Sequence, residues 1–283
     1  MIPVAFDYEV AESVDHAIEL LGQHGEDSKL MAGGHSLIPL MRIRLAAPSV
    51  LIDLGRLDDL RYVREDGDHL AIGAMTRHRD LLYNDLVKEH CGILGFTAGL
   101  LGDPSVQHRG TLGGTLAHGD AAGDMPSVVT ALDAELVVKG PDGERTIKVQ
   151  DFFQDFLFTA LEPQEVVTEI RVPKLGSNTG WSYKKFSRRS QDWAVVGVAA
   201  VVERSNGGIG SARIALTNMS STPMRASAVE QALSGADASA VAEAADAADE
   251  GTSPASDEAA DADFRRHLAR VWTRRAIEEA LGR

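Results

Sequence analysis

The chain has 283 residues, of which 44% are hydrophobic and 25% are charged, as expected for an ordinary globular protein with a sizeable core. The formal net charge of −14 argues against nucleic acid as a partner, because phosphate binding requires clustered Lys and Arg. The N-terminal residues lack the pattern of a secretion signal and no run of about 18 apolar residues occurs, so we expect a cytoplasmic protein without a transmembrane segment.

The first part of the chain has the pattern of a small parallel βαβ unit. An amphipathic helix is indicated by an apolar stripe with a period near 3.6 residues, by Ser13 as N-cap and by Gly25 as the C-terminal stop. Extended segments lie before and after this helix. The predicted strand, helix, strand and strand cover residues 2–10, 13–25, 28–34 and 50–54.

From about residue 60 short strands alternate with short helices. The sequence 134–149 predicts a hairpin, because "GPDG" separates two β-rich runs. A further strand ends at Pro173 and is followed by the polar, glycine-containing segment 174–180. We therefore expect a domain boundary there, with a first domain 1–176, divided into subdomains 1–56 and 57–176, and a second domain 177–283.

The C-terminal part begins with β-like runs suited to an antiparallel sheet, at residues 180–186, 193–203 and 209–218. A helix is predicted at 225–233. The segment 236–263 consists almost entirely of Ala, Asp, Glu, Ser and Gly, which predicts a solvated helix and a flexible loop. An amphipathic helix with an arginine-rich, solvated face closes the chain.

The stretch "AGGHS" places two glycines between a predicted strand and a short helix that starts near Ser36. Gly33 and Gly34 let the backbone approach a ligand closely, and N–H groups at the helix start can bind an anion such as a diphosphate. The stretch matches neither the dinucleotide fingerprint nor the Walker A pattern. Glycine turns of this kind also occur without any ligand, so this loop alone leaves both readings open.

A second glycine turn, "TLGGT", makes a ligand-binding role more plausible. Thr111, Gly113, Gly114 and Thr115 form another loop of small and hydroxyl-bearing residues, which suggests that backbone approaches a ligand from two sides. Asp124 follows at the start of a predicted helix. Its carboxylate could cap that helix or accept hydrogen bonds from ribose hydroxyls.

A third cluster reverses the acidic character of the chain locally. Lys184, Lys185, Arg188 and Arg189 precede an apolar strand. A solvated strand edge, a bound phosphate or an acidic partner surface would each account for these cations.

In this order and spacing, "AGGHSLIPLM", "TLGGTLAHGDAAGDMP" and "KKFSRRSQDWAVVGVAA" resemble the FAD-binding (medium) subunits of the molybdenum hydroxylases, in particular the branch of aerobic carbon monoxide dehydrogenase. The resemblance covers essentially the whole chain. It implies an α+β fold with a PCMH-type FAD-binding N-terminal region, made of a small parallel βαβ subdomain and a mixed α+β subdomain. The implied C-terminal domain has a three-stranded antiparallel sheet with helices.

The resemblance also implies which residues contact FAD. The first loop would wrap the diphosphate, the second would also bind the cofactor, Asp124 would lie near the ribose or adenine, and Lys184 near the flavin. The implied FAD-binding residues are Ala32, Gly33, Gly34, His35, Ser36, Leu37, Thr111, Gly113, Gly114, Thr115, Asp124, Val167 and Lys184. Many relatives have Asn where this chain has Thr115.

The role implied is that of a flavoprotein subunit in an oxidoreductase complex. Cys91 is the only cysteine, so this chain alone cannot hold a cysteine-ligated iron–sulfur cluster. The resemblance implies that [2Fe–2S] clusters lie on a small partner subunit and molybdopterin on a large one, in a dimer of heterotrimers. The flavin would take electrons from the clusters and pass them to an external acceptor, such as a quinone or cytochrome chain. We assign no catalytic acid, base or metal ligand to this chain, and expect association with the inner membrane face only through partners.

Other interpretations remain open. The complex could oxidise xanthine, nicotine-type heterocycles or aldehydes in place of carbon monoxide, since the molybdenum subunit sets the substrate. The chain could also be a self-sufficient FAD oxidase, although 283 residues leave little room for a substrate domain, or a scaffold with vestigial loops. His35 and His118 lie in the two loop regions and could act as proton donors or attachment points for the flavin, but an ordinary loop histidine is the commoner case.

Overall fold

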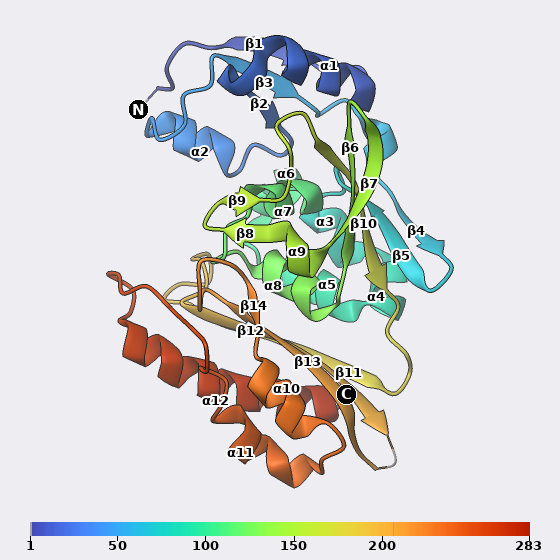
Figure 1. The fold of residues 1–283 in the computed structure, drawn as a ribbon, viewed down its shortest axis with the longest axis vertical. Coiled ribbons are helices and arrows are strands. Elements are labelled where there is room, and N and C mark those ends of the chain that lie inside the picture. Colours follow the sequence, from blue (N-terminus) through green and yellow to red (C-terminus); the bar gives the residue numbers. More distant parts are fainter. Residues whose placement is uncertain (1, 206) are drawn as a thin grey trace.

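Three parts of the fold follow one another along the long axis of the molecule, in the order of the sequence (Figure 1). The computed structural model describes residues 2–205 and 207–283. Within these residues, no helix has the length and apolar character needed to cross a bilayer.

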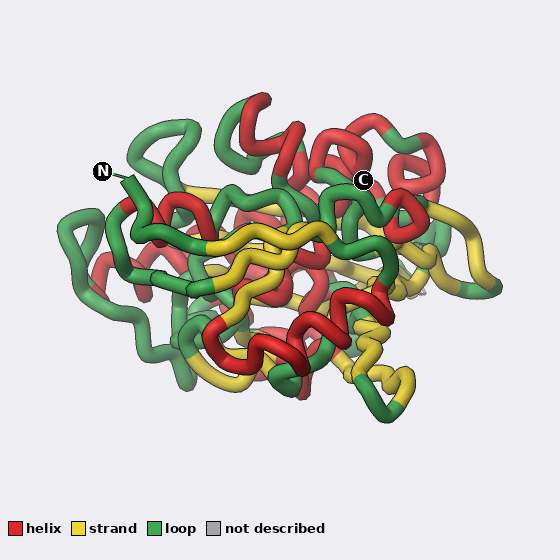
Figure 2. Tube along the Cα trace, turned by 90° about the horizontal axis from the view of Figure 1, so that it is seen from above, coloured by secondary structure: helices red, strands yellow, loops and turns green. Residues whose placement is uncertain are grey.

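The first part is the predicted parallel unit, a three-stranded sheet in the order β1-β3-β2. Figure 2, seen from above, shows its strands side by side with a helix beside them. Its elements are β1 (Asp7–Val10), α1 (Val14–His24), a 3₁₀ turn (Gly25–Asp27), β2 (Ser28–Met31), α2 (Leu37–Arg42) and β3 (Val50–Asp53).

Helix α1 has the predicted boundaries. The Ser13 hydroxyl accepts a hydrogen bond from the N–H of His16, and Gly25 ends the helix with a φ of 61°, which favours glycine. The apolar stripe packs against the sheet, and Ala17 and Ile18 are buried there. The capping signals and the stripe together therefore placed this helix correctly.

The middle part holds a five-stranded antiparallel sheet in the order β4-β5-β10-β6-β7, and short helices pack with it around one apolar core. The predicted hairpin is the β6–β7 pair, in which Gly140 is opposite Gly143. The strands are β4 (Val63–Asp66), β5 (His69–Gly73), β6 (Glu135–Gly140), β7 (Gly143–Lys148), β8 (Phe153–Asp155), β9 (Phe158–Thr159) and β10 (Val166–Pro173). The helices are a 3₁₀ turn (Asp58–Leu60), α3 (His78–Tyr83), α4 (Asp85–His90), α5 (Gly92–Ala98), α6 (Pro104–Arg109), α7 (Leu112–His118), α8 (Asp124–Ala131) and α9 (Val149–Phe152).

The third part is an antiparallel sheet in the order β11-β12-β13-β14, covered by helices. The α+β fold class is confirmed, and the very short β14 adds one strand to the edge of the three that we predicted. The elements are β11 (Thr179–Phe186), β12 (Val196–Ser205), β13 (Gly208–Thr217), β14 (Met224–Arg225), α10 (Ser227–Leu233), a 3₁₀ turn (Ala238–Ala240), α11 (Val241–Ala245) and α12 (Ala262–Leu281).

Strand β12 connects the core of the middle part with that of the third part. Val198 and Ala200 on one face pack in the C-terminal core beneath α12, whereas Ala199 and Val201 on the other face belong to the core of the middle part. Alternate side chains of a strand point to opposite faces of its sheet, and here both faces are buried. Elements from the middle and third parts are consequently held in fixed positions relative to each other.

The prediction of a solvated helix in segment 236–263 is wrong. Val241 and Ala244 of α11 are buried against α10 and α12, because the alanines provide a small apolar face that the composition alone does not reveal. The solvated arginine face of the last helix also needs correction, since Arg265 is only 1% exposed.

Candidate functional site

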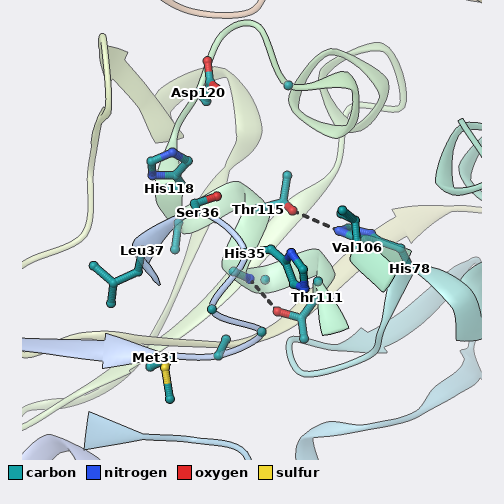
Figure 3. Close-up of a pocket in the computed structure, with 18 of the residues that line it drawn as sticks. Met31, His35, Ser36, Leu37, His78, Val106, Thr111, Thr115, His118 and Asp120 are labelled. Carbon is teal, nitrogen blue, oxygen red and sulfur yellow. Dashed lines mark hydrogen bonds between the residues drawn. The ribbon is translucent and has the colours of Figure 1, made fainter. Parts of the chain in front are cut away.

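The first glycine loop, the second glycine loop and the start of the third part surround one cavity of about 590 Å³. This volume is in the range of small-molecule and cofactor sites. Figure 3 shows His35 and Ser36 of the first loop near Thr111, Thr115 and His118, which belong to α7 and its N-cap. Apart from Lys184, every residue that the sequence analysis assigned to FAD lines this cavity.

Gly33 is where the two loops touch. A Cβ at this position would lie 2.2 Å from the carbonyl oxygen of Arg109 and 2.8 Å from the Cα of Gly110. Such distances leave no space for any side chain. Its neighbour Gly34 has a φ of 76°, in the left-handed region that favours glycine. The paired glycines therefore serve close packing of chain on chain as well as access for a ligand.

The second glycine loop is in fact the N-terminal turn of α7, and it shows the same kind of packing. A Cβ on Gly113 would lie 2.5 Å from the Cβ of Ala74, and the Gly113 N–H donates to the carbonyl of Ala74. Thr111 is the N-cap of α7, since its hydroxyl accepts from the N–H of Gly114 at 3.2 Å. This turn is thus fixed from outside by Ala74, the residue that follows β5, and from within by its own cap.

This packing leaves backbone donors free at the cavity. Among the described residues, none accepts a hydrogen bond from the N–H groups of residues 33–37. Buried backbone N–H groups almost always have a partner, and consecutive free N–H groups beside a cavity form a site for an anion. The residues present therefore fit a diphosphate-bearing group.

His78 lies against the second loop and was missed by the sequence analysis. Its Nε2 is 3.1 Å from the Thr115 hydroxyl, a contact marked in Figure 3, while its buried Nδ1 has no partner among the described residues. Burial, with a smaller effect of nearby His35, lowers the pKa of His78 to about 4. The imidazole is therefore neutral near pH 7 and holds Thr115 by a hydrogen bond. Nothing in "MTRHRD" distinguishes this histidine from a surface residue.

Asp124 does not cap α8, whose N-cap is Gly123. Its buried carboxylate accepts from the Tyr183 hydroxyl at 2.6 Å and from the Lys185 ammonium at 2.8 Å. Burial raises the pKa of Asp124, an effect that the Lys185 charge and these hydrogen bonds oppose. Burial and the adjacent carboxylate also raise the pKa of Tyr183 well above its usual value. Asp124 is thereby fixed at the cavity wall by two residues of β11.

Only one cation of the basic cluster reaches the cavity. Lys185 lines it, whereas Lys184 points to the opposite face of β11 and forms an ion pair with Glu279 of α12. Arg188 donates to the carbonyl of Glu258. Lys184, which the resemblance places near the flavin, does not line the cavity, because neighbouring side chains of a strand face opposite ways. The geometry therefore favours Lys185 as the lysine whose charge lies next to the ligand.

The remaining wall is mostly apolar and has few charges. Val167 lies in it on β10, as expected, and the loop between β11 and β12 closes one side. The lining residues that the sequence analysis did not assign to the ligand include Lys29, Leu157, Leu161, Gln191, Asp192 and Trp193. Gln191, Asp192 and Trp193 lie within the third motif, whereas Lys29, Leu157 and Leu161 come from segments that the sequence analysis did not connect with the ligand.

Comparison with known proteins gives matches along the whole chain. A family model described as "FAD binding domain in molybdopterin dehydrogenase" matches residues 4–175, and one described as "CO dehydrogenase flavoprotein C-terminal domain" matches 181–280. The carbon monoxide dehydrogenase medium chain of Hydrogenophaga pseudoflava is 42% identical, over 100% of this chain and 99% of the relative. The 6-hydroxypseudooxynicotine dehydrogenase complex subunit alpha of Paenarthrobacter nicotinovorans is 37% identical, over 100% and 97%.

A solved structure is similar over the same length. A chain of the carbon monoxide dehydrogenase of Hydrogenophaga pseudoflava, in a form that lacks the Mo-pyranopterin moiety of the molybdenum cofactor, superimposes with a TM-score of 0.98. It is 44% identical, and the alignment covers 100% of this chain and 99% of that one. The arrangement of the cavity therefore belongs to a fold already seen in such an enzyme.

Proposed function

We propose that this chain, which belongs to the family of FAD-binding domains in molybdopterin dehydrogenases, is the flavin-carrying subunit of a carbon monoxide dehydrogenase complex. The observation that carries the proposal is the 42% identity to a carbon monoxide dehydrogenase medium chain over both full lengths. The cavity formed by the two glycine turns supports it, because its free N–H groups and volume fit FAD.

Each part of the cavity has a proposed role in holding the cofactor. Residues 33–37 bind the diphosphate through their N–H groups beside Ala32, and residues 111–115 close the other side of the same group. Asp124 faces the ribose or adenine, Val167 contributes apolar wall, and Lys185 places its charge beside the ligand. The assignment of Lys185 replaces that of Lys184, whose charge is turned toward α12.

FAD held by these residues would supply the redox chemistry, namely the transfer of electrons from iron–sulfur clusters of a partner subunit to an external acceptor. The protein residues bind the cofactor, orient it and exclude water. The neutral His78 keeps Thr115 in place, and the Tyr183–Asp124 hydrogen bond fixes the carboxylate next to the Lys185 charge. None of these steps requires a catalytic acid or base from this chain.

The proposed assembly contains two further subunits. A small subunit carries the [2Fe–2S] clusters and a large subunit carries molybdopterin, in a dimer of heterotrimers that acts in the cytoplasm or at the inner membrane face. A quinone or cytochrome chain is the proposed acceptor. Within this chain, we assign residues 1–176 to FAD binding, with subdomains 1–56 and 57–176, and residues 177–283 to the C-terminal domain.

A second candidate is the medium subunit of a complex that oxidises a different substrate. The 37% identity to a subunit of a 6-hydroxypseudooxynicotine dehydrogenase complex favours it specifically. The substrate would be decided on the molybdenum subunit, so the cavity described here fits both candidates. The open cavity and the packed glycine turns give no support to a scaffold with vestigial loops.

The test is to isolate the chain with its native partners. A tagged chain is purified from its host under mild conditions, its partners are identified by mass spectrometry, and FAD is quantified after acid release. We expect one FAD per chain, an iron–sulfur and a molybdopterin subunit, and reduction of a dye by carbon monoxide. Dye reduction by a nicotine-type heterocycle alone would select the second candidate, and a flavin-free complex would contradict both.

A further inference from the structure

Arg265 of α12 is a buried guanidinium that connects two segments of the third part. It donates to the carbonyl of Val195 and, through its other terminal nitrogen, to Asp257 at 2.6 Å. A buried charge is costly unless it is paired and hydrogen-bonded, so these contacts largely determine where the chain runs. One contact lies at the end of a loop that borders the cavity, and the other lies in the Ala- and Asp-rich segment.

The loop that borders the cavity is formed by residues 187–194, the rim loop. It joins β11 to β12 and is closed at its base by a hydrogen bond from the N–H of Val195 to the carbonyl of Phe186. Its residues Gln191, Asp192 and Trp193 line the cavity, and Trp193 remains 69% exposed. The rim loop thus forms the side of the cavity that faces solvent.

Contacts from outside hold the rim loop in place. Arg188 donates to the carbonyl of Glu258 at 3.3 Å, and the Asn218 amide donates to the carbonyl of Ala194 at 2.7 Å. Together with Arg265, these side chains attach both ends of the loop to other segments. Two of the three attachments involve residues 257–265, outside the FAD-binding region.

Asp257 is the centre of this attachment. One carboxylate oxygen accepts from the N–H groups of Ala259 and Ala260, at 2.8 and 3.1 Å, and the other binds Arg265. The side chain of Asp257 therefore both folds its own segment and fixes the buried guanidinium. Charge-assisted hydrogen bonds of this kind are stronger than neutral ones.

We propose that Asp257 and Arg265 are positioning residues for the rim loop, and that the 257–265 region thereby slows the release of FAD from the cavity. The inference rests on the proposed function, since it takes FAD as the occupant. The 257–265 region, whose composition alone indicates no function, thereby helps to retain the cofactor. The physical path runs from Asp257 through Arg265 to Val195, and from there to the cavity-lining residues two to four positions earlier in the chain.

The test compares two carboxylates near the start of α12 in the assembled complex. Asp257→Asn removes the charge that holds Arg265. Asp263→Asn is the matched control, because the exposed Asp263 pairs, among the described residues, with the partly exposed Arg266 on the same helix. We expect FAD to dissociate about tenfold faster from the Asp257→Asn complex, the effect of losing one charge-assisted hydrogen bond, and the control to match the unaltered complex.

A second variant and a second readout separate positioning from general destabilisation. Arg188→Ala removes another attachment and leaves no buried charge unpaired; we expect FAD to dissociate about threefold faster at an unchanged melting temperature. The fluorescence anisotropy of Trp193, obtained by subtracting the signal of a matching Trp193→Phe complex, should fall in Asp257→Asn and stay unchanged in Asp263→Asn.

The possible failures are distinguishable. If the unaltered complex holds FAD but Asp257→Asn releases it at the rate of the control, or leaves Trp193 anisotropy unchanged, the inference is overturned and the proposed function stands. If the unaltered complex holds no flavin, the proposed function itself fails.

Discussion

The first glycine loop and the rim loop border the same cavity but are held in opposite ways. Gly33 has the backbone of Arg109 pressed against it, so the first loop is positioned by main-chain packing that admits no side chain. The rim loop is attached through side chains, chiefly those of Arg265 and Asn218. Backbone packing has essentially one arrangement, whereas side-chain attachments can be lost singly. The cavity therefore has one rigid wall and one wall that substitutions can loosen step by step.

The largest effect is expected at the rigid wall. Gly33→Ala places a methyl group 2.2 Å from a carbonyl oxygen, so the two loops must separate. We expect a loss of more than about 3 kcal/mol in unfolding free energy and no FAD in the purified complex. Denaturant unfolding and flavin analysis measure the two quantities. Gly22→Ala on α1 is the control, because its methyl group meets only the flexible Gln164 side chain; normal FAD content in Gly33→Ala would refute rigid packing.

The second effect concerns pH and the residue beneath the second loop. The pKa of His78 is lowered from 6.5 to about 4, so between these values the unfolded chain binds a proton that the folded chain does not. Stability should therefore fall as pH falls from about 6.5 to about 4, by about 3 kcal/mol in all. His78→Gln, compared with the unaltered chain by urea unfolding across this range, should lose that part of the dependence. Parallel curves for the two proteins would show that His78 is not buried as described.

The third effect separates two neighbouring lysines. Lys185→Met leaves the Asp124 carboxylate buried with Tyr183 as its only side-chain partner, and should cost about 2 kcal/mol of stability and weaken FAD binding. Lys184→Met removes a partly exposed pair with Glu279 and should cost less than about 1 kcal/mol without changing FAD affinity. Denaturant unfolding and flavin titration of the two variants show which of the two lysines supports stability and FAD binding. The reverse ranking would mean that Lys184 faces the ligand.

The smallest effect is expected at the side-chain-held wall. Asp257→Asn should change only how fast FAD leaves, by about tenfold, while the amount bound at saturation stays at one per chain. If this variant lost FAD as completely as Gly33→Ala, the contrast between a rigid and an adjustable wall would be wrong.

Local signals in the sequence predicted the elements that depend on local chemistry. The Ser13 cap and Gly25 stop placed α1, and the turn at "GPDG" placed the β6–β7 hairpin. The two glycine loops were identified because glycine is needed where backbone approaches closely. What the sequence did not contain was the reason for Gly33, since its contact with Arg109 joins distant segments.

The features that the sequence analysis did not foresee are ones that only tertiary packing decides. Because successive side chains of a strand point to opposite faces of the sheet, Lys184 and Lys185 on β11 must face opposite ways. Which of the two faces the cavity depends on where α12 packs. His78 becomes a buried, neutral residue only through the second loop that covers it. The alanines near residue 244 are buried by α12, a partner that a composition rich in Asp and Glu does not predict.

The most direct measurement of the central claim is an experimental structure of the assembled complex with its cofactor. The account predicts FAD with its diphosphate bound by the N–H groups of residues 33–37, next to the second loop, and with the Lys185 side chain on the cavity side of β11. A cavity filled by protein side chains, or a nucleotide other than FAD on these loops, would contradict it.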